Sequence, residues 1–155
     1  MDHRISKHGK DILKSKNYNK MHGYIQHGSV SVFRHCVRVA ETSLKIERFL
    51  KKRFNVKMDE RALVRGALLH DYFLYDWHNK KDRPKGLHGF THPGTALKNA
   101  IRDYAVSERE KKIIRQHMFP LTITKIPTCK EAWVVNIADK WCSLAETAKM
   151  RKKRH

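Results

Sequence analysis

Apolar residues recur along most of the chain at intervals of three and four, which is the spacing of amphipathic helices. This spacing predicts long helices over residues 29–54, 59–69 and 130–150. Shorter helices are expected to begin near residues 11, 93 and 107. In the last long segment an apolar stripe predicts the face turned toward the core, made of Trp133, Ile137, Trp141, Leu144 and Ala148.

Residues with helix-capping chemistry agree with these boundaries. Asp59 can accept a hydrogen bond from a free backbone N–H group at the start of its helix. Ser107 and Glu110 have the spacing of a capping box. Pro93 suits the first position of a helix, which makes His92 the expected cap residue. The sequence therefore predicts an all-α fold, with a single bundle of about six or seven helices.

The two ends of the chain are basic and lack the long apolar pattern. We therefore expect a basic N-terminal arm over residues 1–28, a helical domain over residues 29–149 and a basic tail over residues 150–155. Whether the arm is ordered stays open at this point, because residues 11–18 could form a short helix.

Composition and charge narrow the class of partner. The 155 residues suit one domain, and 34 Lys and Arg against 15 Asp and Glu give a formal net charge of +19. This charge favours nucleotides, nucleic acid or an anionic membrane surface as partners. No apolar run approaches the roughly 20 residues that a membrane span needs. The three cysteines form no CxxC pair, which argues against a disulfide framework and for a reducing cytoplasm.

The dipeptide His70-Asp71 stands at the end of one predicted helix, on the same stripe as Leu63 and Ala67. That stripe is expected to face the core. A buried imidazole beside a buried carboxylate is costly unless something binds both, and a divalent metal would do so. The alternative is a helix end capped by a solvated His and Asp.

Further histidines and one aspartate have comparable positions on other predicted helices. A lone His on an apolar face, such as His35, is by itself more often a core residue than a ligand. Taken together, four imidazoles and two carboxylates suit iron, manganese, zinc, cobalt or nickel, and their number fits two divalent ions better than one. The proposed metal ligands are His35, His70, Asp71, His92, His117 and Asp139.

At these residues the chain resembles the HD-domain metal-dependent phosphohydrolases. The resemblance rests on His35 in FRHCVRVA, on His70-Asp71 in GALLHDYFL and on Asp139 in NIADKWCS. His92 in THPGTA and His117 in IIRQHMFP resemble the two extra histidines of dinuclear members. The resemblance covers about residues 29–145. It does not include the GYP signature of the cyclic-dinucleotide enzymes, nor the Lys that some relatives carry shortly after His-Asp.

The resemblance implies hydrolysis of a phosphate ester or anhydride by attack of a metal-bound hydroxide. Asp71 is then the expected bridging ligand, and it forms the catalytic centre together with His70. The substrate is expected to be a nucleotide or another small phosphorylated metabolite.

Substrate contacts are expected from polar residues near the proposed ligands and from the charged loop over residues 80–89. An ordinary solvated surface is the alternative for each of them. The start of a helix at Pro93-Gly94 would also offer free N–H groups to a phosphate. The candidate substrate-binding residues are His27, His78, Lys81, Arg83 and Lys140.

Two other functions stay open from the sequence. A nucleic-acid-binding module would explain the positive charge, although the basic residues are spread over the whole chain and form no known binding motif. A di-iron oxygenase could use the same set of ligands. The sequence does not indicate an oligomeric state.

Overall fold

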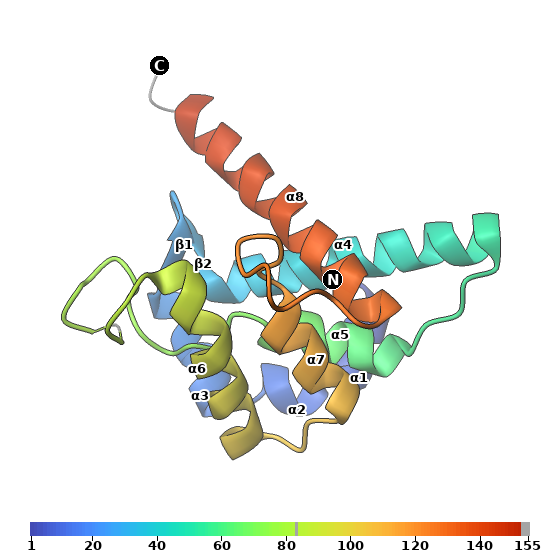
Figure 1. Ribbon diagram of the computed structural model, residues 1–155, viewed down its shortest axis with the longest axis horizontal. Coiled ribbons are helices and arrows are strands. Elements are labelled where there is room, and N and C mark those ends of the chain that lie inside the picture. The colour runs from blue at the N-terminus through green and yellow to red at the C-terminus, as the bar shows by residue number, and fades with distance from the viewer. Residues whose placement is uncertain (83, 153–155) are drawn as a thin grey trace.

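The computed structural model describes residues 1–82 and 84–152, with the backbone alone for Met150 and Lys152. These residues form eight α-helices and one two-stranded hairpin (Figure 1). The predicted all-α bundle is confirmed. The number of helices exceeds the expected six or seven, because the N-terminal segment forms several short helices.

The N-terminal segment packs against the bundle. It contains α1 (His3–His8), α2 (Lys10–Leu13), α3 (Lys16–Asn19) and the 3-10 helix η1 (Lys20–Gly23). Four of its apolar side chains are fully buried: Ile5, Ile12, Tyr18 and Met21. Ion pairs add to this packing, since Arg65 lies 2.6 Å from Asp11 and Arg4 lies 3.1 Å from Glu60. Residues 1–23 therefore belong to the folded body, while the domain boundary after residue 28 stays a prediction.

A short hairpin leads from this segment into the first long helix. Strand β1 (Ile25–His27) pairs antiparallel with β2 (Val30–Ser31), and Gly28 turns between them with a φ of 61°. The predicted helix over residues 29–54 consequently begins later, as α4 (Val32–Phe54). The hairpin matters for the site because it brings residues 26 and 27 toward the centre of the bundle.

The core is formed where α5 (Glu60–Leu69) packs against α4, and where both contact α8 (Lys130–Lys152). Helix α7 (Glu108–Gln116) lies against α5 and α8, and α6 (His88–Asp103) lies against α7. The capping predictions for α5 and α7 are confirmed. Asp59 accepts from the N–H of Ala62 at 2.9 Å, and Ser107 and Glu110 form a complete capping box.

The predicted start of α6 is wrong. The helix begins at His88, so His92 and Pro93 lie inside it and His92 is not a cap residue. A proline inside a helix removes one backbone hydrogen bond and crowds the carbonyl group four residues earlier, yet the helix continues through Pro93 to Asp103. His92 is buried in this turn, and its Nδ1 donates to the carbonyl oxygen of His88. Pro93-Gly94 is consequently not a free helix start, and the phosphate site expected there is also wrong.

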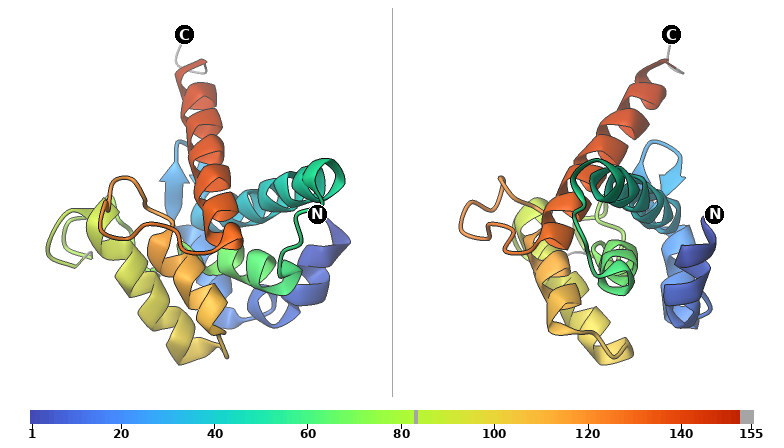
Figure 2. Two further views of the ribbon diagram at one scale, coloured as in Figure 1. Left: turned by 45° about the vertical axis from the view of Figure 1, so that its right-hand side comes forward. Right: turned by 90° about the vertical axis from the view of Figure 1, so that its right-hand side faces the viewer.

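The predicted core face of α8 is wrong as well. Trp133, Ile137, Trp141 and Leu144 are between 41% and 70% exposed, and Ala148 is also exposed. The helix instead turns a face of smaller and polar residues inward: Ala132, Val135, Ala138, Asp139, Cys142 and Glu146. Small side chains allow a close approach to α4, and the C-terminal turns of α8 extend beyond the rest of the bundle (Figure 2).

Among the residues that the structure describes, no helix has the length and apolar character needed to cross a membrane. The predicted basic tail over residues 150–155 falls partly outside the described residues. Helix α8 continues to Lys152, and residues 153–155 are not described.

Candidate metal centre

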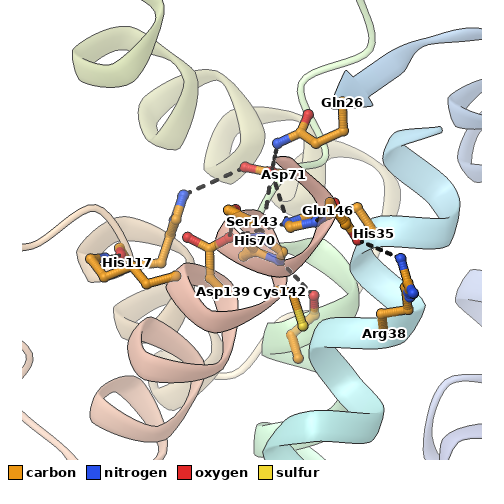
Figure 3. A network of polar contacts seen from close by, with 12 residues as sticks. Gln26, His35, Arg38, His70, Asp71, His117, Asp139, Cys142, Ser143 and Glu146 are labelled. Carbon is orange, nitrogen blue, oxygen red and sulfur yellow. Dashed lines mark hydrogen bonds and ion pairs between the residues drawn. The ribbon is translucent and has the colours of Figure 1, made fainter. Parts of the chain in front are cut away.

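Six buried side chains that lie in, or directly after, five helices meet at the centre of the bundle. All of them except His92 are labelled in Figure 3. His35 lies in the first turns of α4, His92 in α6 and Asp139 in α8, whereas His70-Asp71 and His117 directly follow α5 and α7. Each of these residues is between 0% and 7% exposed. The structure therefore brings together all six of the residues that the sequence suggested as ligands: His35, His70, Asp71, His92, His117 and Asp139.

Asp71 is at the centre of this cluster. Its Oδ1 lies 3.1 Å from Nε2 of His92 and 3.5 Å from Nε2 of His117. Its Oδ2 lies 3.4 Å from Nε2 of His70 and 3.8 Å from Nε2 of His35. The two carboxylate oxygens thus face two different groups of histidines.

Each group has donor atoms close enough together to hold a metal ion. In the group of Asp71, His35 and His70, and in the group of Asp71, His92 and His117, all donor atoms lie within 4.8 Å of one another. Asp139 adds a second carboxylate to the first group, with Oδ1 3.1 Å from Nε2 of His35 and 3.6 Å from that of His70.

Backbone carbonyl groups decide which ring nitrogen of three of the histidines is protonated. A carbonyl oxygen only accepts hydrogen bonds, so the Nδ1 that faces it carries the hydrogen and Nε2 of the neutral ring presents a lone pair. The pairs are His70 with Ala67 O (2.7 Å), His92 with His88 O (2.8 Å) and His117 with Ile114 O (2.8 Å).

The inward atoms of the cluster fit a bound cation. Nε2 of His92 and Nε2 of His117 are only 2.8 Å apart, although the neutral forms of both rings present lone pairs there. Nε2 of His70 and Oδ1 of Asp71 are buried without a hydrogen-bond partner. Positive charge between these atoms would remove the repulsion and satisfy them. The donor set of imidazoles and carboxylates suits divalent transition metals.

His35 is oriented by a carboxylate instead of a carbonyl. Its Nδ1 donates to Oε2 of Glu146 at 3.0 Å, and Arg38 binds the other oxygen of Glu146 at 3.1 Å. Burial by itself would lower the pKa of His35. The hydrogen bonds to Asp139 and Glu146 outweigh burial and raise the pKa of His35 to about 10.

Burial and neighbouring charges also shift the pKa values of the other ligands. Burial opposes ionisation of Asp71 and Asp139, yet the neighbouring histidines hold the pKa of both carboxyls well below the usual range. Burial also opposes the charged form of His70, and the charge of Asp71 nevertheless raises its pKa well above the usual value. Burial lowers the pKa of His117. Without a metal ion, protons on His35 and His70 therefore balance the two carboxylates, and a divalent cation bound to these atoms would replace those protons.

A comparison with known families agrees with this geometry. The family model described as HD domain matches residues 32–143, which is more than half of the chain. The chain belongs to the HD domain family. This places it in the superfamily of metal-dependent phosphohydrolases. No curated protein and no solved structure gives a significant match to the chain.

Two residues that contact the centre were not recognised from the sequence, and both lie outside the matched range of 32–143. Gln26 on β1 donates from Nε2 to Oδ2 of Asp71 at 2.7 Å, and Glu146 binds His35. Glu146 follows Asp139 by seven residues on one predicted helix, so the helical period could have indicated it. Nothing local indicates Gln26, because only the packing of the hairpin brings it to the site.

A cavity of about 740 Å³ opens from the HD centre toward solvent, and Asp71, His92, His117 and Asp139 form part of its lining. His27 and Lys140 also line it. Among the described residues, the lining includes neither His78 nor Lys81. His78 is about half exposed and pairs with Asp76 in the loop, while Lys81 is exposed. Arg83 lies outside the described residues.

Proposed function

We propose that this HD domain is a phosphohydrolase that uses two divalent metal ions to cleave a phosphate ester or anhydride of a small metabolite, such as a nucleotide. The observation that carries the proposal is the division of the two Asp71 oxygens between two groups of histidines. A carboxylate in this position can bridge two ions. Asp71 is therefore assigned as the bridging ligand, with His70 beside it.

The remaining ligands divide between the two ions. His35, His70 and Asp139 would hold one ion, and His92 and His117 would hold the other. Iron, manganese, zinc, cobalt and nickel all suit these donors. When bound, such ions supply the activation of water at neutral pH and the neutralisation of charge on the phosphoryl oxygens.

Two residues of the cavity have further assigned roles. Lys140 lines the cavity next to Asp139, and its Nζ donates to the carbonyl oxygen of His117 at 3.1 Å. The other hydrogens of this ammonium group would bind a phosphoryl oxygen. His27 also lines the cavity, and burial lowers the pKa of its ring. The proposal assigns to this ring the exchange of a proton with the leaving group. The proposal does not use His78 or Lys81, which lie away from the cavity.

The test is metal removal and reconstitution. Protein treated with a chelator should release no phosphate from a panel of nucleotides and phosphorylated metabolites. Two equivalents of Mn²⁺, Co²⁺, Fe²⁺, Ni²⁺ or Zn²⁺ should restore release, under anaerobic conditions as well as in air. Full activity of the metal-free protein would contradict the proposal. A strict need for oxygen would favour the di-iron oxygenase instead.

A second candidate is a weak association with nucleic acid on another face. A groove of about 940 Å³ lies beside α7, and its lining includes four basic side chains: Lys111, Lys112, Arg115 and Lys125. Glu108 also lines the groove and pairs with Lys111, which reduces its net charge. Binding of an oligonucleotide should weaken steeply with added salt and should not depend on the metal ions. Salt-independent binding would contradict a phosphate contact.

A further inference from the structure

The cavity above the metal centre has room for more than a phosphoryl group. Its volume of about 740 Å³ falls within the range of roughly 300–1,000 Å³ that is typical of small-molecule sites. The ligands lie at its inner end. The outer lining is therefore available to the organic part of a substrate, and its chemistry indicates what that part is.

One part of the lining is a stack of aromatic rings. The rings of Trp77 and His88 are stacked at 4.9 Å with 12° between their planes, and His88 stacks on His92 at 4.5 Å. Hydrogen bonds fix these rings, since Nε1 of Trp77 donates to the carbonyl of Ile25 at 3.1 Å and the hydroxyl of Tyr75 lies 3.1 Å from Nδ1 of His88. These fixed rings extend from His92 along the wall of the cavity. They favour a bound organic group that is flat or apolar.

Another part of the lining is aliphatic. Met118, Pro120 and Leu121 follow α7, and Leu144 lies on the stripe of α8 that faces solvent. Leu121 is 48% exposed and Leu144 is 70% exposed. Apolar side chains at the mouth of a polar site are poorly suited to water, and an apolar ligand group would cover them.

The charge of the lining limits the number of phosphate groups. Lys140 is the only Lys or Arg that lines the cavity in the part of the chain that the structure describes. The loop lysines at positions 80, 81 and 85 do not line it. Among the described residues, a polyphosphate chain that extends beyond the metal ions would therefore find no further Lys or Arg in the lining, whereas a single phosphate would be bound by the centre and Lys140.

We infer that the substrate is a phosphate monoester whose leaving group has a flat aromatic or apolar surface. This inference rests on the proposed function and narrows it. In the reaction the oxygen of water bonds to phosphorus, and the bond from phosphorus to the ester oxygen breaks. The electron pair of that bond stays with the ester oxygen, which takes a proton from the water. The products are an alcohol or phenol and inorganic phosphate.

The first experiment measures binding without turnover. Calorimetry on the metal-loaded protein compares two phosphonates that cannot be hydrolysed, 1-naphthylmethylphosphonate and methylphosphonate. The naphthyl compound should bind at least about tenfold more tightly. Its naphthyl group is large enough to reach the aromatic rings and the leucines of the lining, whereas the methyl group of the other compound is not. Equal dissociation constants would overturn the inference.

A matched pair of variants tests whether Leu144 contributes to the difference in affinity between the two phosphonates. Leu144→Ala and Ile137→Ala both shorten an exposed apolar side chain of the same stripe of α8, but only Leu144 lines the cavity. Leu144→Ala should weaken binding of the naphthyl compound by about fivefold to tenfold and leave methylphosphonate unchanged. Ile137→Ala should change neither. Equal effects of the two substitutions would overturn the assigned contact.

Measurements of turnover test whether the substrate carries one phosphate or several. They also distinguish failure of the monoester inference from failure of the phosphohydrolase proposal. For 1-naphthyl phosphate, kcat/KM should exceed that for ATP by at least about tenfold. An equal or higher value for ATP would overturn the inference while leaving the phosphohydrolase proposal intact. If no phosphate ester is hydrolysed and neither phosphonate binds, both proposals fail.

Discussion

The two halves of the metal centre share Asp71 but are supported differently. In the half formed by His35 and His70, a second carboxylate from Asp139 faces both rings, and the buried carboxylate of Glu146 orients His35. In the half formed by His92 and His117, both rings are oriented by backbone carbonyls of their own segments, and Asp71 is the only carboxylate near them among the described residues.

The two halves also differ in how their histidines are placed relative to the cavity. Both histidines of one half, His92 and His117, line the cavity. In the other half Asp139 lines it, whereas the rings of His35 and His70 do not. More negative charge and less access imply tighter binding and slower exchange of a cation. We therefore expect the His35 half to retain its ion and the His92 half to exchange its ion and face the substrate.

Asp71→Ala is expected to have the largest effect, because it removes the carboxylate that both halves share. Bound metal, measured by elemental analysis after dialysis, should fall from two equivalents toward zero, and phosphate release should fall by ~10³-fold or more. Asp76→Ala, which removes a half-exposed carboxylate five residues later, should change neither quantity. Retention of both ions by Asp71→Ala would refute the bridging role.

Single histidine substitutions should separate the halves. His117→Ala should lose the exchangeable ion and keep one tightly held ion, while His35→Ala should lose the tight ion. Metal content and the rate of release to a chelator distinguish these outcomes. If both variants lose the same ion, the halves do not differ as the structure implies.

Glu146→Gln tests the carboxylate behind His35. The amide can still accept the hydrogen bond of Nδ1, but it removes a buried negative charge that orients and polarises the ring. Metal affinity of the His35 half should fall by about 10- to 100-fold, with the other half unaffected. Glu108→Gln, at a carboxylate that is 83% exposed, serves as the control. Unchanged affinity in the Glu146 variant would show that His35 needs no carboxylate partner.

Gln26→Ala should have the smallest effect. Its amide donates one hydrogen bond to the Asp71 oxygen that faces the His35 half. Loss of this bond should weaken metal binding by roughly tenfold or less, since the ions themselves also orient Asp71. Gln116→Ala removes an amide that bonds Thr128 away from the centre and should have no effect on metal binding. Isothermal titration with Mn²⁺ measures both variants, and a loss as large as that of Asp71→Ala would contradict this ranking.

The sequence by itself determined the features that depend on neighbouring residues. Asp59 and the pair Ser107 and Glu110 cap their helices through hydrogen bonds that span three residues, so local spacing is sufficient to predict them. The stripe that carries His70-Asp71 is buried as its period predicts. The six candidate ligands were also visible, because metal chemistry restricts the residue types and each one stands at a helix face or end.

Only the tertiary structure decided which surfaces meet. Helix α8 has large apolar residues on one side and small ones on the other, and local pattern does not reveal that the small side packs against α4. His92 lies inside α6 and not at its start, and packing places its Nε2 2.8 Å from Nε2 of His117, which the usual position of a proline in a helix does not predict. Gln26 reaches Asp71 across 45 residues. Such contacts depend on how distant elements are placed relative to one another. The free energy of the whole fold determines this placement, and the local spacing of residues does not predict it.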